Sequence, residues 1–105
     1  MYVILWEFRV PAERRAAFES AYGPDGAWGR LFAQAAGFLG LDLLRCGEQA
    51  GRYVTIDRWQ SRDDFDAFKR DFAAPYAALD RELEGLSGVE TRLGAFDGLA
   101  LDRPA

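Results

Sequence analysis

The fold is decided by residues 52–68, which read RYVTIDRWQSRDDFDAF. Residues 52–60 are rich in β-branched and aromatic side chains, and they alternate in the way that predicts a β-strand. One face of this strand carries Val54 and Ile56, and the other carries Tyr53, Thr55, Asp57 and Trp59. Ser61, followed three residues later by Asp64, resembles a capping box, so a helix is expected to begin directly after the strand.

The segment after Ser61 predicts a long amphipathic helix. Its apolar residues recur every three or four positions, as one buried helix face requires: Phe65, Phe68, Phe72, Tyr76, Leu79, Leu83 and Leu86. Pro75 is expected to interrupt or kink this helix, because its ring clashes with the carbonyl group of Asp71. Residues 89–96 then predict a final strand.

The N-terminal half supplies the remaining elements. Alternating and helical patterns predict strands over 2–10 and 38–46, a hairpin loop over 47–51, and helical pieces over 12–22 and 28–35. The order β-α-α-β-β-α-β is that of an α+β, ferredoxin-like βαββαβ fold. Right-handed crossovers give a four-stranded antiparallel sheet with the strand order 4-1-3-2 and helices on one face. We expect one domain over residues 1–97 and a C-terminal tail over 98–105.

The strands carry apolar side chains on both faces, although helices can cover only one. In the first strand, Val3 and Leu5 lie on the face opposite Ile4 and Trp6. Leaving such side chains in water forfeits on the order of 1.5–3 kcal/mol each. A two-fold homodimer that packs sheet against sheet removes this cost, so we expect a homodimer.

Composition excludes several classes of function. The chain has no histidine and no asparagine, and only one cysteine, Cys46, which rules out imidazole bases, histidine-ligated metals and intrachain disulfides. We therefore expect no metal. No GxGxxG or P-loop pattern occurs either, so we expect no other cofactor. The net charge of −4 argues against a nucleic-acid partner. With no apolar run long enough to span a bilayer and no signal-peptide pattern, we expect a cytoplasmic protein with no membrane partner.

The chain resembles the antibiotic biosynthesis monooxygenase family over residues 2–97. The resemblance lies in four segments: VILWEFRV, YGPDGAWGRLFAQAAGFLGLDLLR, RYVTIDRWQSRDDFDAF and AAPYAALDRELEGLSGVETRLGAF. Its most specific part is Asp57-Arg58-Trp59-Gln60-Ser61, which matches a W-x-S signature. The resemblance implies a dimeric α+β barrel with a small cavity in each subunit. Some members of this family oxidise polycyclic phenols with O2 and no cofactor, others degrade haem or isomerise lactones, and many have no known activity.

The haem-degrading branch of this family resembles the chain at Trp59. That activity also requires an asparagine in the first strand and a histidine ligand, and neither residue type occurs here. Tyr76 is the residue left that could ligate iron. The resemblance therefore implies cofactor-independent oxidation of a small aromatic, polyketide-type phenol or quinol by O2. The alternative is a non-catalytic ligand-binding or accessory barrel of the same fold.

Asp57 and Tyr76 are the candidate catalytic residues. A carboxylate within an apolar strand has a raised pKa if it is buried unpaired, which suits a general base. The alternative for Asp57 is a structural ion pair with Arg45, Arg58 or Arg92. Tyr76 follows Pro75 and could donate a hydrogen bond to a phenolate, or it could simply pack in the core.

The candidate substrate-binding residues are aromatic side chains on strands and helices: Trp59, Tyr53, Trp6, Trp28, Phe68 and Phe72. Tyr53 could also hydrogen-bond a phenolate. Each of these residues has core packing as its alternative, because large aromatic side chains mainly fill cores. Glu7 and Glu90 are expected at sheet edges or at the dimer seam, paired with Arg9 or Arg92.

Overall fold

The computed structural model describes residues 1–99, and the rest of the predicted tail lies outside them. The elements in chain order are β1 (Tyr2–Arg9), a 3-10 turn η1 (Ala12–Arg14), α1 (Arg15–Tyr22), α2 (Ala27–Phe32), β2 (Phe38–Arg45), β3 (Arg52–Trp59), α3 (Arg62–Asp71), α4 (Ala73–Glu82) and β4 (Val89–Asp97). The second predicted helical piece is shorter than expected, because α2 ends at Phe32 rather than Ala35. Within residues 1–99, no helix is long and apolar enough to cross a membrane.

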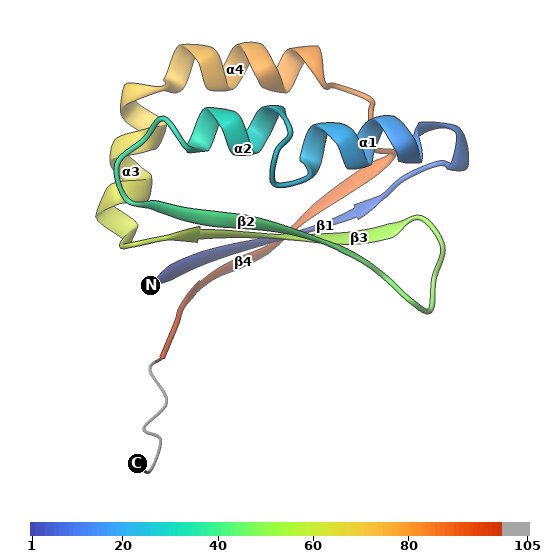
Figure 1. Ribbon diagram of the computed structural model, residues 1–105, viewed down its shortest axis with the longest axis horizontal. Coiled ribbons are helices and arrows are strands. Elements are labelled where there is room, and N and C mark those ends of the chain that lie inside the picture. Colours follow the sequence, from blue (N-terminus) through green and yellow to red (C-terminus); the bar gives the residue numbers. More distant parts are fainter. Residues whose placement is uncertain (100–105) are drawn as a thin grey trace.

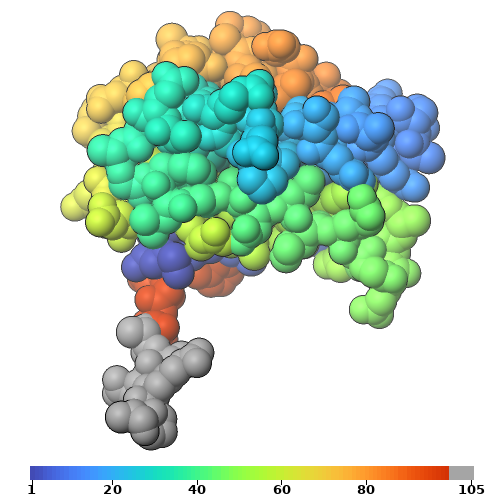
Figure 2. Space-filling model, viewed as in Figure 1, coloured from blue at the N-terminus to red at the C-terminus, as the bar shows by residue number. Residues whose placement is uncertain are grey.

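The four strands form one antiparallel sheet in the order β2-β3-β1-β4, which confirms the predicted ferredoxin-like topology. All the helices lie on the same side of the sheet (Figure 1). Their atoms form a continuous layer above the strands, and the loop between β2 and β3 points downward, away from that layer (Figure 2). The helical layer therefore covers one face of the sheet and leaves the other open.

The predicted alternation in β3 is confirmed. Its helix-facing residues are all buried, and those on the open face are half-buried. At the exit from the strand, the Ser61 hydroxyl oxygen accepts a hydrogen bond from the backbone N–H of Asp64 at 3.1 Å. Gly37 approaches the same point with a φ of +86°, and a Cβ on it would overlap the Asp64 side chain. The cap therefore fixes both the start of α3 and the entry to β2.

The alternation of β2 is interrupted at its start, where strict alternation would put Phe38 on the face opposite Leu39 and Leu41. A bulge lies between Phe38 and Gly40, so Phe38 pairs with Trp59 and Gly40 pairs with Arg58. Phe38 therefore joins the helix-facing side, where it packs against the core, and Leu39 is 52% exposed. The bulge inserts one extra residue into β2, so the side chain before it points to the opposite face of the sheet from the one that strict alternation would give.

The predicted long helix is broken, as Pro75 required, but the break lies at Phe72. There the backbone leaves the helical region, with φ −111° and ψ 24°, and α4 begins at Ala73. Pro75 thus falls in the first turn of α4, where its missing N–H has no intrahelical partner to lose. The break lets α4 take its own direction across the helical layer (Figure 1).

The buried residues form two clusters rather than one continuous core. One cluster contains Trp28, Leu31, Phe32, Leu41, Trp59 and Phe68. The other contains Phe8, Val10, Phe18 and Tyr53. β3 joins them, because Trp59 belongs to the first cluster and Tyr53 to the second.

We predict that Ser61→Ala lowers the free energy of unfolding by about 1 kcal/mol, because it leaves the Asp64 backbone N–H without its cap. Urea denaturation measures this loss. The matched control is Ser20→Ala, an exposed position inside α1 where alanine is the better helix former. Equal effects of the two substitutions would show that the cap contributes nothing.

Candidate functional site

A cavity of about 160 Å³ lies between the sheet and the helices. Strands contribute Trp6, Phe8, Leu41, Thr55, Asp57 and Glu90 to its lining, and helices contribute Tyr22, Trp28, Phe32, Tyr76 and Asp80. Members of both buried clusters are among these residues. The cavity is therefore bounded by the two clusters and closed on one side by α4.

The sequence of β3 explains why this space is not filled. On its helix-facing side the large rings of Tyr53 and Trp59 stand at the two ends, with Thr55 and Asp57 between them. Threonine and aspartate are too small to replace a third ring, and both are buried here. Two large residues flanking two small polar ones thus produce an aromatic cavity with a polar floor.

Asp57 is the most unusual residue of the cavity. Its exposure is 9%, and burial raises the pKa of its carboxyl from 3.8 to about 7. The alternative of a structural ion pair is not what is observed. Arg58 pairs with Asp42, Arg45 pairs with Glu19, and in the described part of the chain no cation pairs with Asp57. Asp57 is therefore a carboxyl that gains and loses its proton near neutral pH.

Tyr76 faces the same cavity from α4. Burial raises the pKa of its phenol to about 12, and the nearby charges of Asp80, Asp57 and Glu90 add to this effect. The Lys69 ammonium lies 3.6 Å from the centroid of the Tyr76 ring, in a cation–π contact. Tyr76 is thus held as a neutral phenol, which is a hydrogen-bond donor across the physiological pH range.

The other predicted site residues divide into two groups. Trp6 and Trp28 line the cavity. Trp59 and Phe68 are fully buried in the first cluster and are not among the lining residues, and Phe72 packs against that cluster from outside. Tyr53 also lies away from the cavity.

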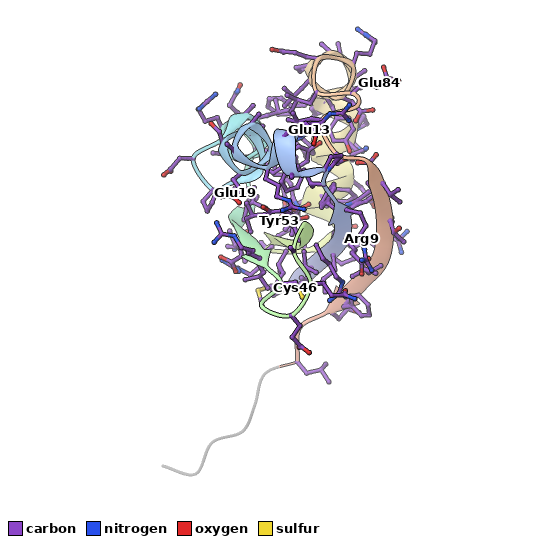
Figure 3. All side chains as sticks on the ribbon, turned by 90° about the vertical axis from the view of Figure 1, so that its right-hand side faces the viewer. Arg9, Glu13, Glu19, Cys46, Tyr53 and Glu84 are labelled. Carbon is purple, nitrogen blue, oxygen red and sulfur yellow. The ribbon has the colours of Figure 1, made fainter. Side chains whose placement is uncertain are left out.

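The Tyr53 hydroxyl is turned toward α1. It donates a hydrogen bond of 2.5 Å to Glu19, and Arg45 binds the other carboxylate oxygen of Glu19 at 2.9 Å. Figure 3 shows Glu19 and Tyr53 together between α1 and the sheet. Tyr53 therefore connects α1 to β3.

Sequence reasoning missed several of the lining residues: Phe8, Tyr22, Phe32, Leu41, Thr55, Asp80 and Glu90. The expectation that Glu90 lies at a sheet edge is confirmed, because β4 is an edge strand, but its predicted pairing with Arg9 or Arg92 is wrong. Glu90 pairs with Phe8 across the strands, so it faces the helices, and it forms no ion pair within residues 1–99. The signal that was available for Asp80 is its spacing of four residues from Tyr76, which places both side chains on one face of α4.

A second hollow of about 450 Å³ adjoins the cavity near the connection from α4 to β4. It shares Tyr22, Asp80 and Glu90 with the inner cavity and is otherwise lined by Arg81, Leu83, Glu84, Gly85, Ser87 and Gly88. We call the three shared residues the mouth. Over residues 1–99, no group of three or more acidic, cysteine or histidine residues is arranged to hold a metal ion.

Taken together, these groups can bind a flat aromatic molecule and move a proton. Aromatic rings form the walls, Asp57 can accept a proton near neutral pH, and Tyr76 can donate a hydrogen bond to an oxygen atom of the ligand. A ring that fills the cavity displaces water from it, which strengthens each of these polar interactions.

Comparison with known proteins identifies relatives of the chain. A family model described as antibiotic biosynthesis monooxygenase matches residues 1–73. No curated protein matches the sequence.

Several solved structures share the fold. SnoaB, a cofactor-independent oxygenase from Streptomyces nogalater, has a TM-score of 0.63 and 22% identity, over 95% of this chain and 94% of that one. The heme-degrader MhuD from Mycobacterium tuberculosis, solved with two hemes in its active site, has a TM-score of 0.66 and 24% identity, over 99% and 100%. PA3566 from Pseudomonas aeruginosa has a TM-score of 0.65 and 16% identity, over 94% of each chain. These likenesses support the fold.

The raised pKa of Asp57 predicts a pH-dependent cost to stability. Between pH 4 and pH 7 the folded state keeps a proton that the unfolded state has released, so stability falls as pH rises through this window. We predict that the free energy of unfolding of Asp57→Asn, measured relative to that of the native protein, increases by roughly 2–3 kcal/mol from pH 5 to pH 8, because asparagine cannot ionise.

Urea denaturation at a fixed protein concentration measures this difference at each pH. Asp42→Asn is the matched control, because Asp42 lies on the open face and pairs with Arg58. A gain for Asp57→Asn that is the same at both pH values would show that Asp57 is ionised with an ordinary pKa.

Proposed function

The chain belongs to the antibiotic biosynthesis monooxygenase family, and on that premise we propose that it oxidises a small aromatic phenol or quinol with O2 and without a cofactor. One observation carries this proposal: a buried carboxyl with a pKa of about 7 lies unpaired in an aromatic cavity. An accessory protein that only fills its interior has no need of such a group, which costs stability.

In the proposed reaction Asp57 removes the acidic proton of the substrate. The resulting anion is electron-rich enough to reduce O2, and the two oxygen atoms are then divided between the product and water. For an anthrone-type substrate, one CH2 group and one O2 molecule become one carbonyl group and one water molecule. The Tyr76 hydroxyl donates a hydrogen bond to the substrate oxygen on which negative charge develops. Trp6 and Trp28 hold the ring system and exclude water.

The residues present do not suit haem chemistry. The sequence has no histidine, its one methionine is Met1, and Cys46 lies at the end of the β2–β3 hairpin, outside the cavity. Tyr76 is the remaining candidate ligand, but its environment raises the pKa of the phenol to about 12 and so opposes the phenolate that iron binds. No step of the proposed mechanism passes through a haem.

We also propose that two subunits pack through the open face of the sheet. In the isolated subunit this face carries apolar side chains that are 49–58% exposed, namely Leu44, Val89 and Phe96. Its charged residues are already paired within the subunit: Glu7 binds Arg9 and Arg52, and Asp42 binds Arg58. A partner therefore gains apolar contact without having to neutralise unpaired charges.

O2 consumption with a panel of anthrones and quinols tests the activity. We expect turnover that falls about tenfold per pH unit below pH 7, as Asp57 becomes protonated, and a loss of about 10²–10⁴ in Asp57→Asn. Tyr76→Phe is expected to lose roughly tenfold, because one hydrogen bond to developing charge is removed.

Tyr53→Phe is the matched control for Tyr76→Phe, because its hydroxyl lies outside the cavity and binds Glu19. Full turnover in both Asp57→Asn and Tyr76→Phe would refute the assigned roles. Absence of turnover with every member of the panel would favour the non-catalytic alternative.

Sedimentation is expected to give about twice the chain mass of 11.8 kDa. Phe96→Lys is expected to shift the protein to a monomer, because it places a charge on the open face without altering the buried clusters. Leu99→Lys, which changes an apolar residue beyond the end of β4, serves as the control. A native protein that sediments as a monomer at micromolar concentration would contradict this arrangement.

A further inference from the structure

The mouth of the cavity carries two carboxylates and no partner for them. Asp80 reaches it from α4 and Glu90 from β4, and neither forms an ion pair within residues 1–99. Burial raises the pKa of Glu90, and the charge of Asp80 raises it further, so the two carboxylates lie close enough to repel each other. A cation placed between them would relieve this repulsion.

The interior of the cavity has the same sign of charge. Asp57, only 9% exposed, is an unpartnered acidic group on the floor of the cavity that the mouth opens into. No lysine or arginine is among the residues that line the inner cavity. Such a site repels an anion at its entrance and again at its floor.

Two cations lie near the mouth, and neither forms an ion pair with it in the described chain. Lys69, on α3, lies over the ring of Tyr76. It lines neither the inner cavity nor the outer hollow. Burial lowers the pKa of Lys69, and the nearby charge of Asp80 opposes this effect. Arg81 lines the outer hollow but forms no ion pair with Asp80 or Glu90 in the described chain. The outer hollow is lined by Ser87 and other residues of the connection between α4 and β4. It therefore has room for a polar substituent of a ligand that extends beyond the mouth.

From these observations we propose that Asp80 and Glu90 select the charge of the ligand: the site takes an aromatic molecule with a protonated amine at the mouth, and rejects aromatic carboxylates. The ring system occupies the inner cavity and the amine lies between the two carboxylates. This inference rests on the proposed function only in taking the cavity as the substrate site, and it requires no turnover.

Calorimetric titration with three probes of matched shape tests the proposal: naphthylmethylamine, naphthylmethanol and naphthoate. At about pH 8 we expect the amine to bind roughly fivefold tighter than the alcohol and the carboxylate roughly fivefold weaker, as ion pairs at a partly exposed mouth predict. Added salt is expected to narrow these differences.

The double variant Asp80→Asn and Glu90→Gln is expected to bring the affinities of the amine and the alcohol within about twofold of each other, because it removes both mouth charges without changing side-chain size. The carboxylate is expected to stay weaker than the alcohol, because Asp57 on the cavity floor is still ionised at this pH. The matched control is Glu13→Gln with Glu82→Gln. It removes the same net charge from exposed positions that line neither the cavity nor the hollow, and it should keep the native order. Thermal unfolding checks that both double variants are folded.

The proposal is overturned if the native protein binds the three probes equally, if it binds none of them, or if the native preference for the amine over the alcohol survives in the Asp80→Asn and Glu90→Gln variant. O2 consumption with an uncharged quinol tests the proposed function separately. Turnover without charge selection would support the proposed oxygenase function and overturn the charge selection by Asp80 and Glu90. Charge selection without turnover would support a ligand-binding site that prefers cations and overturn the oxygenase function.

Discussion

A carboxyl group held without a counter-ion between two aromatic clusters is the constraint on which the rest of the structure depends. Asp57 cannot turn toward solvent, because Tyr53 and Trp59 on the same face of β3 each anchor one of the clusters. Slipping the strand by one residue would expose both rings and bury Arg58. The proton affinity of Asp57 is therefore set by packing rather than by a charged partner, and the cost of its ionisation is met by the two clusters that flank it.

Local signals explain why so much of the fold could be predicted from the sequence. The alternation in residues 52–60 and the pair Ser61 and Asp64 identify a strand and a helix start by interactions within a few residues, and both were confirmed. The bulge in β2 could not be predicted in this way, because Phe38 and Leu39 are both apolar and either could have faced the core. Its position depends on the partner strand, where Trp59 is buried and Arg58 is not.

The site was less accessible to sequence reasoning than the fold. Asp57 stood out because a carboxylate is rare in an apolar strand, whereas Asp80 and Glu90 resemble ordinary surface charges in the sequence. Trp59 was expected to contact a ligand, as were Trp6 and Trp28, yet it is buried in a cluster while the other two line the cavity. The sequence alone does not show which rings meet one another, since strand parity gives the face of the sheet but not the neighbours across the helical layer. The informative pattern is on the helix-facing side of β3, where the small residues Thr55 and Asp57 lie between Tyr53 and Trp59. When the two large rings pack against the helices, the small residues between them leave a gap.

The break at Phe72 separates two tasks that an unbroken helix would have combined. α3 holds Phe68 in the core and begins at the cap on Ser61, whereas α4 has no fully buried residue and contributes Tyr76 and Asp80 to the cavity. Changes on α4 can therefore alter what the cavity admits at little expense to folding. A scaffold divided in this way is readily diversified: a combinatorial library confined to the inner face of α4, with β3 kept intact, samples new ligand preferences while the acid–base group stays in place.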